Sequence, residues 1–151
     1  MIAYFLMKVG LDENIPTYSG GLGTLIGDTL YSFADLGIPA VCITLFYKKG
    51  YVYQKIGKDG RQIDLEDEWN YSKVLKPLSV EVEWLLGDMK QKLRVWEYMI
   101  KGKRNIKVIF LDGDIESNDQ IVRKAFQRLY YSDREKRLIQ EIAIGIGGYR
   151  V

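Results

Sequence analysis

The chain has 151 residues, enough to bury the core of one globular domain spanning residues 1–151. Its formal net charge of +2 gives no reason to expect a nucleic acid or a membrane surface as a partner. The absence of histidine excludes Ser-His-Asp and Cys-His catalytic arrangements and histidine-based metal sites, so no metal is expected. The single cysteine, Cys42, excludes an intrachain disulfide and suits a reducing compartment. No signal peptide and no membrane-spanning run is visible, so a cytoplasmic location is expected.

The first third of the chain predicts a βαβ unit. Residues 2–9 are nearly all apolar, which predicts a strand buried on both faces. The spacing of apolar residues predicts a helix from about Thr24 to Leu36, with Gly37 as its left-handed stop. Residues 40–46 predict a second buried strand, expected to lie parallel to the first with a right-handed crossover. Residues 51–56 predict a further strand.

The rest of the chain predicts a hairpin, a strand and two helices. Residues 78–84 alternate between apolar and polar side chains, as in a half-exposed antiparallel strand, and residues 93–100 are its expected hairpin partner. Residues 106–111 predict another buried strand. Apolar residues recur at helical spacing from Ile121 to Leu129. A capping box at Ser132–Glu135 predicts the start of the last helix.

A glycine-rich turn, Tyr18-Ser19-Gly20-Gly21-Leu22-Gly23, separates the first predicted strand from the first predicted helix. Such a turn lets backbone N–H groups approach an anion, which the N-terminus of the following helix also attracts. The turn lacks the Lys-Ser/Thr ending of a Walker loop and the spacing of the dinucleotide-binding motif. Alone, it indicates either a tight connection or an anion-binding site.

Further motifs follow this turn in a fixed order: Gly27-Asp28, Ala34–Pro39, Leu45–Tyr51, Phe110–Asp112, Arg128–Tyr130 and Gln140–Gly148. Together they resemble the α-glucan (glycogen and maltodextrin) phosphorylases, in the same order and over nearly the whole chain. Glycosyltransferases of the glycogen-synthase kind also carry a Gly-Gly-Leu-Gly turn. In those enzymes a lysine precedes the turn, whereas Tyr18-Ser19 precede it here, which disfavours that alternative.

The resemblance implies an α/β fold, namely a partial Rossmann-like N-terminal lobe of a GT-B-type glycosyltransferase with an inserted antiparallel β-hairpin region. Phosphorylases cleave α-1,4-glucan with inorganic phosphate and release glucose 1-phosphate, so α-glucan and phosphate are the implied ligands. Their pyridoxal phosphate is held by a lysine of the C-terminal lobe, and its phosphate group acts as the acid–base group.

The resemblance also implies roles for individual residues. Gly20 and Gly21 would present amides to the cofactor and substrate phosphates, and Leu22 would lie against the glucosyl unit. Tyr47 and Tyr51 belong to a matching motif and are candidates for the wall of the cleft, or simply core aromatics. Asn118 could approach sugar hydroxyls, although an asparagine that forms a turn is the plainer interpretation.

Three departures from the family limit what this chain can do alone. Met7-Lys8-Val9 stands where the family commonly has Met-Glu-Phe, and Gly27-Asp28-Thr29 stands where it has Gly-Asp-His. The lobe that bears the cofactor lysine is also missing. No catalytic residue is therefore assignable on this chain. Pyridoxal phosphate is expected only in a complete two-lobe assembly, and the lone chain is expected to be inactive.

Two hypotheses stay open. The chain is either part of a phosphorylase that works with a complementary C-terminal chain, or a non-catalytic remnant that binds glucan or phosphate or that oligomerises. The last segment, residues 142–148, is apolar enough that docking onto a complementary chain or a second copy is expected.

Overall fold

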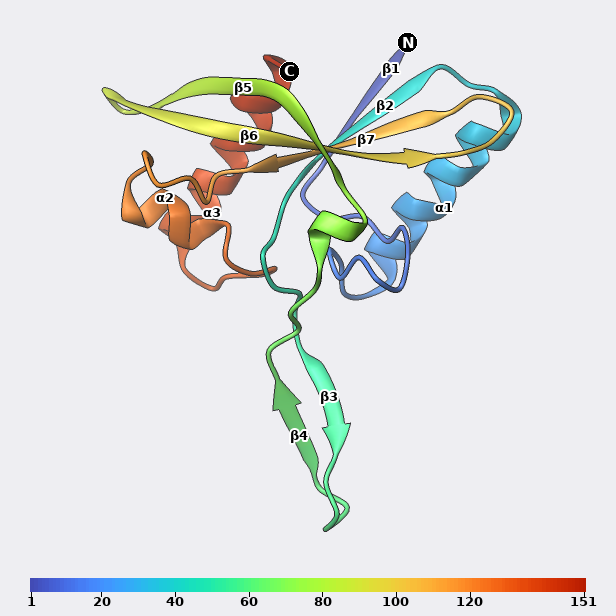
Figure 1. Ribbon diagram of the computed structural model, residues 1–151, viewed down its shortest axis with the longest axis vertical. Coiled ribbons are helices and arrows are strands. Elements are labelled where there is room, and N and C mark those ends of the chain that lie inside the picture. Colours follow the sequence, from blue (N-terminus) through green and yellow to red (C-terminus); the bar gives the residue numbers. More distant parts are fainter.

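The computed structural model describes residues 1–151 and contains one five-stranded sheet and a separate two-stranded hairpin (Figure 1). The large sheet has the order β1-β2-β7-β6-β5. Its strands are β1 (Ile2–Leu6), β2 (Ala40–Leu45), β5 (Lys76–Leu86), β6 (Met89–Ile100) and β7 (Ile106–Asp112). The hairpin consists of β3 (Tyr53–Ile56) and β4 (Gln62–Leu65). The helices are α1 (Gly21–Leu36), a 3-10 turn (Tyr71–Lys73), α2 (Gln120–Ala125) and α3 (Arg134–Ile142), which continues into a π-helical turn (Ala143–Gly147).

The large sheet is parallel at one end and antiparallel at the other. β1 pairs with β2 and β2 with β7 in parallel, whereas β6 pairs with both β7 and β5 in antiparallel fashion. The βαβ unit is therefore confirmed, since α1 connects the adjacent parallel strands β1 and β2. The β5–β6 hairpin is confirmed as well. The fold is mixed α/β, as expected.

Each face of the sheet carries its own hydrophobic core. On one face, Ile26 and Leu30 of α1 belong to the cluster that contains Cys42 and Phe110. On the other face, α2 and α3 pack against a cluster that contains Leu111 of β7. Successive strand residues point to opposite faces, so the near-continuous apolar sequence of β7 supplies both clusters.

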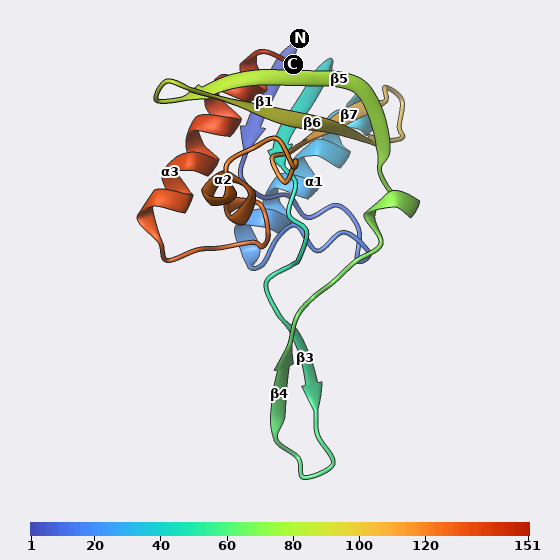
Figure 2. The ribbon, with the colours of Figure 1, turned by 60° about the vertical axis from the view of Figure 1, so that its left-hand side comes forward.

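The β3–β4 hairpin projects away from the body in both views of the ribbon (Figures 1 and 2). All eight residues of its two strands are exposed. Only the first of these strands was predicted from the sequence, because β4 is short and has no apolar run of its own.

The prediction that residues 2–9 form a strand buried on both faces is wrong. β1 ends at Leu6, and the side chains of Ile2 and Phe5 are 47% and 40% exposed. The reason is its position, because β1 is an edge strand with β2 as its one neighbour.

The two predicted helices near the C-terminus begin and end at other residues than expected. Asp133, not Ser132, caps α3, since its carboxylate accepts hydrogen bonds from the amides of Glu135 and Lys136. An aspartate one residue later thus displaces the serine of the predicted capping box. The helix predicted from Ile121 to Leu129 ends at Ala125.

One face of the apolar segment near the C-terminus packs against the sheet of the same chain. Ala143 and Ile144 are buried in the cluster that also contains Ile43 and Trp84. On the other side of the same helix, Leu138 and Ile146 are 55% and 47% exposed. This outer face is the part of the segment that remains available to another chain.

Candidate functional site

The glycine turn leads directly into α1, and its Gly21 and Leu22 amides have no partner in the chain. Gly20 has φ +83°, and the helix begins at Gly21, three residues before the predicted start. The first N–H groups of a helix have no partner within it. The N–H groups of Gly21 and Leu22 donate to no backbone or side-chain acceptor of this chain. The N–H of Gly23 donates to the Gly20 carbonyl at 3.2 Å. Both residues are exposed, so these donors are open to a ligand.

The glycines of this region have different reasons to be glycine. Gly20 needs its left-handed backbone. A Cβ at Gly23 would lie 2.5 Å from Cβ of Tyr18, and one at Gly27 would lie 1.7 Å from the Gly10 carbonyl oxygen. A Cβ at Gly21 would meet nothing within 4 Å. Folding of this chain therefore explains every glycine here except Gly21, which points to the approach of a ligand.

A cavity of about 290 Å³ lies beside the turn. Leu22 lines it together with Tyr47 and Tyr130, and the charged side chains in its wall are Lys8 and Arg137. No carboxylate is among the lining residues. Arg137 is paired with Glu141 at 3.0 Å, so Lys8, together with the N-terminus of the 16-residue helix α1, makes this cavity suited to an anion.

Tyr130 connects the turn to the rest of the cavity wall. Its hydroxyl accepts a hydrogen bond from Nζ of Lys8 at 2.6 Å and donates one to the Ser19 carbonyl at 2.8 Å. The ring of Tyr51 stands edge-on to the Tyr130 ring with the centroids 5.5 Å apart. The structure thus brings the predicted residues Gly20, Gly21, Leu22 and Tyr51 around a residue that was not predicted.

Tyr47 forms part of the same wall but is not free to react. Its side chain is 2% exposed, and its hydroxyl donates to the Met7 carbonyl at 2.7 Å. Burial raises the pKa of Tyr47 well above the usual value for a tyrosine. Its role is to hold the end of β1 in place.

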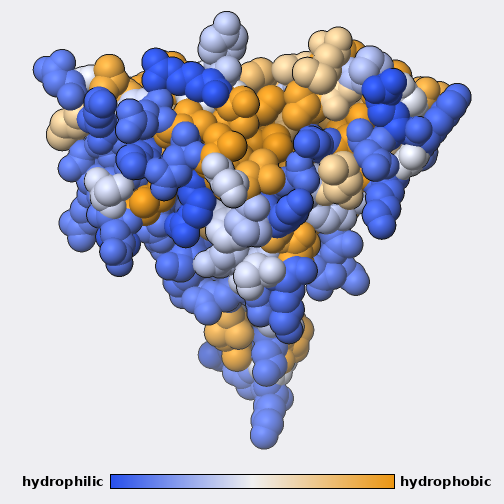
Figure 3. All heavy atoms as spheres, turned by 45° about the horizontal axis from the view of Figure 1, so that its top comes forward, coloured by the Kyte–Doolittle hydropathy of each residue, from blue (hydrophilic) through white to orange (hydrophobic).

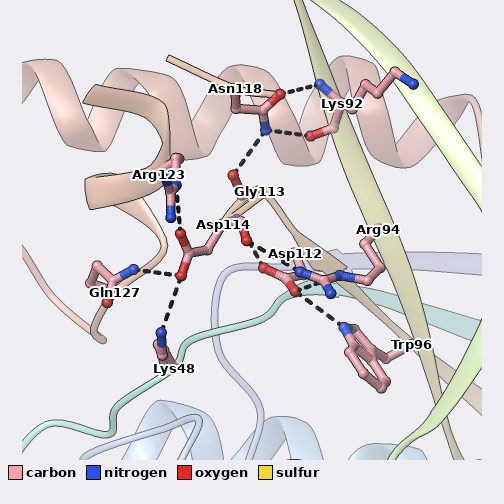
Figure 4. Close-up of polar contacts among 10 residues, drawn as sticks. All are labelled: Lys48, Lys92, Arg94, Trp96, Asp112, Gly113, Asp114, Asn118, Arg123 and Gln127. Carbon is pink, nitrogen blue, oxygen red and sulfur yellow. Dashed lines mark hydrogen bonds and ion pairs between the residues drawn. The ribbon is translucent and has the colours of Figure 1, made fainter. Parts of the chain in front are cut away.

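Asn118 lies elsewhere, in the loop that follows β7 (Figure 4). Its side-chain oxygen accepts from the Lys92 amide at 2.7 Å. Both hydrogens of its amide group are also used, by the carbonyls of Lys92 at 2.7 Å and Gly113 at 2.9 Å. At 6% exposure it ties this loop to β6, the structural role that a turn asparagine suggests.

Two aspartates at the end of β7 complete this polar network (Figure 4). Burial raises the pKa of Asp112, whose carboxylate receives Arg94 Nε at 3.2 Å and Trp96 Nε1 at 3.3 Å. Burial alone would raise the pKa of Asp114 too, but hydrogen bonds from Arg123 and Gln127 outweigh it and the pKa is lowered. Every member of the network has a partner within the chain, so the network stabilises the carboxyl ends of β2 and β7.

The arrangement is suited to the recognition of an anion. The free amides of Gly21 and Leu22 lie at the start of α1, and the cavity lined by Leu22 carries the cations Lys8 and Arg137 and no carboxylate. No group of three or more His, Cys, Asp or Glu side chains is placed to hold a metal ion. No helix has the length and apolar character needed to cross a membrane.

Comparison with known proteins identifies the source of these motifs. The chain is 38% identical to the maltodextrin phosphorylase of Thermococcus litoralis and to the glycogen phosphorylase of Mycobacterium tuberculosis, with 99% of the chain aligned in both cases. The identity with the glycogen phosphorylase of Aquifex aeolicus is 37% over 97% of the chain. The chain is homologous to a segment of the glycogen and maltodextrin phosphorylases. No family model matches it.

The chain spans a minor part of these phosphorylases, 18% of the length of the first two and 22% of the third. Three residues of the candidate site were not singled out from the sequence as site residues, namely Lys8, Tyr130 and Arg137. Lys8 gave one signal, its reversal of a charge that phosphorylases commonly carry. Tyr130 belongs to a segment, Arg128–Tyr130, that resembles the phosphorylases, but that match gave it no role. Arg137 gave no signal, because its place beside the glycine turn depends on the packing of α3.

Proposed function

We propose that this chain supplies the phosphate-facing part of the N-terminal lobe of an α-glucan phosphorylase, which releases glucose 1-phosphate from α-1,4-glucan with inorganic phosphate in the cytoplasm. The observation that carries this proposal is the pair of free amides at Gly21 and Leu22 beside a cationic cavity. The homology to phosphorylases supplies the reaction class.

In this proposal, the residues of the turn bind and orient rather than react. The amides of Gly21 and Leu22 donate to a phosphate oxygen, and the ammonium of Lys8 adds to the positive potential. The Leu22 side chain, 57% exposed, forms an apolar contact for a glucosyl ring. Pyridoxal phosphate, when held by the second lobe, supplies the acid–base group that this chain lacks.

The surface offers a place for that second lobe at the β1 edge. The β5 edge is protected against pairing by Lys76, Pro77 and the register shift that follows them. The β1 edge, Ile-Ala-Tyr-Phe-Leu over residues 2–6, has neither a charge nor a proline. An unprotected apolar edge is a site for the addition of a strand.

An apolar groove of about 580 Å³ extends from β2 across the sheet to β5. Its apolar lining includes Val41, Ile43, Leu78, Val80 and Ile109, together with Met1 and Val151 from the two ends of the chain. Figure 3 brings forward the side of the molecule on which both termini lie and shows apolar side chains gathered in its middle. The exposed face of α3 adds further apolar surface beside β1. We assign this surface to the complementary phosphorylase polypeptide, with self-association of the chain as the alternative.

A pair of matched variants tests that surface. Ile2 on the β1 edge is 47% exposed, and Leu85 of β5, which does not line the groove, is 51% exposed, so a lysine at either position adds one charge at a similar exposure. Ile2→Lys should weaken association with the remainder of a phosphorylase, measured by light scattering, and Leu85→Lys should leave it unchanged. Equal effects of the two variants, or a wild-type chain that stays a monomer with that partner present, would contradict the assignment.

The second candidate function, a non-catalytic remnant that binds phosphate or glucan, is favoured by one observation. Lys8 stands where phosphorylases commonly have glutamate, and it lies in the wall of the cavity. A lysine here strengthens the binding of an anion and changes the charge that an active site would present to its substrate.

A chimera separates the two functions. This chain replaces the homologous segment of the Thermococcus litoralis maltodextrin phosphorylase, and the release of glucose 1-phosphate is measured. Activity that falls on Gly21→Ala supports the phosphorylase role. A folded chimera that binds pyridoxal phosphate but turns over only after Lys8→Glu supports the remnant.

A further inference from the structure

Tyr130 has a backbone conformation that no other residue with a side chain shares. Its φ is +65°, and it is the one non-glycine residue with a positive φ. The left-handed conformation is unfavourable for a residue with a bulky side chain, so the surroundings have to hold it.

The surroundings that hold Tyr130 belong to the segment after β2. The amide of Leu129 donates to the Lys49 carbonyl at 3.2 Å, and Lys49 forms a parallel bridge with Arg128. The Leu129 side chain is 2% exposed. The Tyr51 ring then meets the Tyr130 ring at an interplanar angle of 76°. These contacts fix the phenol ring between the end of β1 and the glycine turn.

The hydrogen bonds of the phenol have one possible direction. An ammonium group only donates, so the Tyr130 oxygen accepts from Lys8 and its own hydrogen goes to the Ser19 carbonyl. A hydrogen bond received from a cation polarises the hydroxyl and strengthens the bond that it donates. The Ser19 carbonyl is therefore held by two successive hydrogen bonds, from Lys8 to Tyr130 and from Tyr130 to Ser19.

We propose that Tyr130 is a positioning residue for the glycine turn, because its hydroxyl fixes the Ser19–Gly20 peptide and with it the direction of the amide donors that follow. The chain has no cis peptide bond, and in a trans peptide the N–H points away from the C=O. Holding the Ser19 oxygen thus sets the Gly20 N–H, one residue before α1 begins. This inference rests on the proposed role of the turn in binding phosphate.

The neighbouring residue provides a control. The Tyr131 hydroxyl also donates to a carbonyl, that of Lys124 at 2.5 Å, but this bond does not involve the glycine turn. Tyr130→Phe and Tyr131→Phe thus each remove one hydroxyl that binds a backbone carbonyl. A merely structural role predicts similar changes in stability and none in the turn.

The test measures the turn directly by NMR. In Tyr130→Phe, the amides of Gly20 and Gly21 should become more mobile on the nanosecond timescale and exchange faster with solvent, while the midpoint of unfolding stays close to that of Tyr131→Phe. Inorganic phosphate, added as the probe, should bind the Phe variant about two- to tenfold more weakly than the wild type, as expected for one lost hydrogen bond. Lys8→Met should change the turn amides in the same direction.

This design distinguishes a failure of the positioning role of Tyr130 from a failure of the proposed function of the turn. Turn amides that behave identically in Tyr130→Phe and Tyr131→Phe, without phosphate, would overturn the positioning role. If phosphate leaves the wild-type Gly21 and Leu22 amides unshifted, the proposed function of the turn loses its support, and the mobility of those amides still decides the role of Tyr130.

Discussion

Replacing Gly21 with alanine separates the demands of folding from those of ligand binding. The new methyl group would point into open space, and Gly21 does not have a positive φ. At such a helical position, Gly→Ala stabilises by about 0.4–1 kcal/mol, chiefly because the unfolded chain loses freedom. For a protein of this size, that corresponds to a rise in Tm of roughly 1–4 °C.

The adjacent Gly20 is the matched control. Its φ of +83° forces any L-residue into the left-handed region. Gly20→Ala should therefore destabilise by about 1–2 kcal/mol, or roughly 2–8 °C in Tm. Thermal unfolding followed by circular dichroism measures both variants.

The functional half of the prediction has the opposite sign. In the phosphorylase chimera, the methyl group of Gly21→Ala should stand where a phosphate approaches the amides, and loss of one preorganised donor costs about 10²–10³ in rate. The variant should thus be more stable and far less active. A fall in Tm would refute the structural argument, whereas a rise in Tm with unchanged activity would show that the turn is only a connection.

Three further outcomes follow from the structure. In urea unfolding, Gly27→Ala should lower the free energy of unfolding by about 1–3 kcal/mol, because its Cβ would lie 1.7 Å from the Gly10 oxygen. Gly145→Ala should leave the free energy of unfolding unchanged, because its Cβ meets open space. Asp133→Ala should lower Tm at neutral pH. Hydrogen bonds from Lys136 lower the folded-state pKa of Asp133 below 3.8. The difference in Tm between wild type and variant should therefore be complete above pH 3.8 and vanish as the pH falls through the folded-state pKa. The lone chain, treated with pyridoxal phosphate and borohydride, should give no stoichiometric pyridoxyl-lysine by mass spectrometry; such an adduct would contradict the assignment of the cofactor to the other lobe.

The sequence was sufficient for the central elements of the fold. Apolar runs located β2 and β7 because these strands are buried along most of their length, and helical spacing located α1 because one of its faces packs on the sheet. The same reasoning failed for β1, since an apolar run does not reveal that a strand lies at the edge of a sheet. It also placed the start of α1 too late, because glycines carry no periodic signal.

The candidate site was only partly visible in the sequence. The turn at Gly20–Leu22 stands out by its composition and by its resemblance to a known motif. Tyr130 also lies in a segment that resembles the family, but the sequence did not place it at the turn, because its position depends on tertiary contacts with Tyr51 and Lys8. Asn118 was singled out by residue type, and the structure places it in the loop after β7, where it bonds to Lys92 of β6 and not to the turn.

The position of β7 between β2 and β6 has a consequence for synthesis of the chain. During translation, β1, α1 and β2 leave the ribosome long before the strand that covers the open side of β2. Until residue 112 has emerged, no strand connects the β5–β6 hairpin to the parallel strands β1 and β2, and both hydrophobic clusters lack the side chains of β7. The β1–α1–β2 piece therefore leaves apolar surface exposed from residue 45 until residue 112 has emerged, and the hairpin joins it in one late step. Such exposed surface makes a nascent chain prone to aggregation during this period.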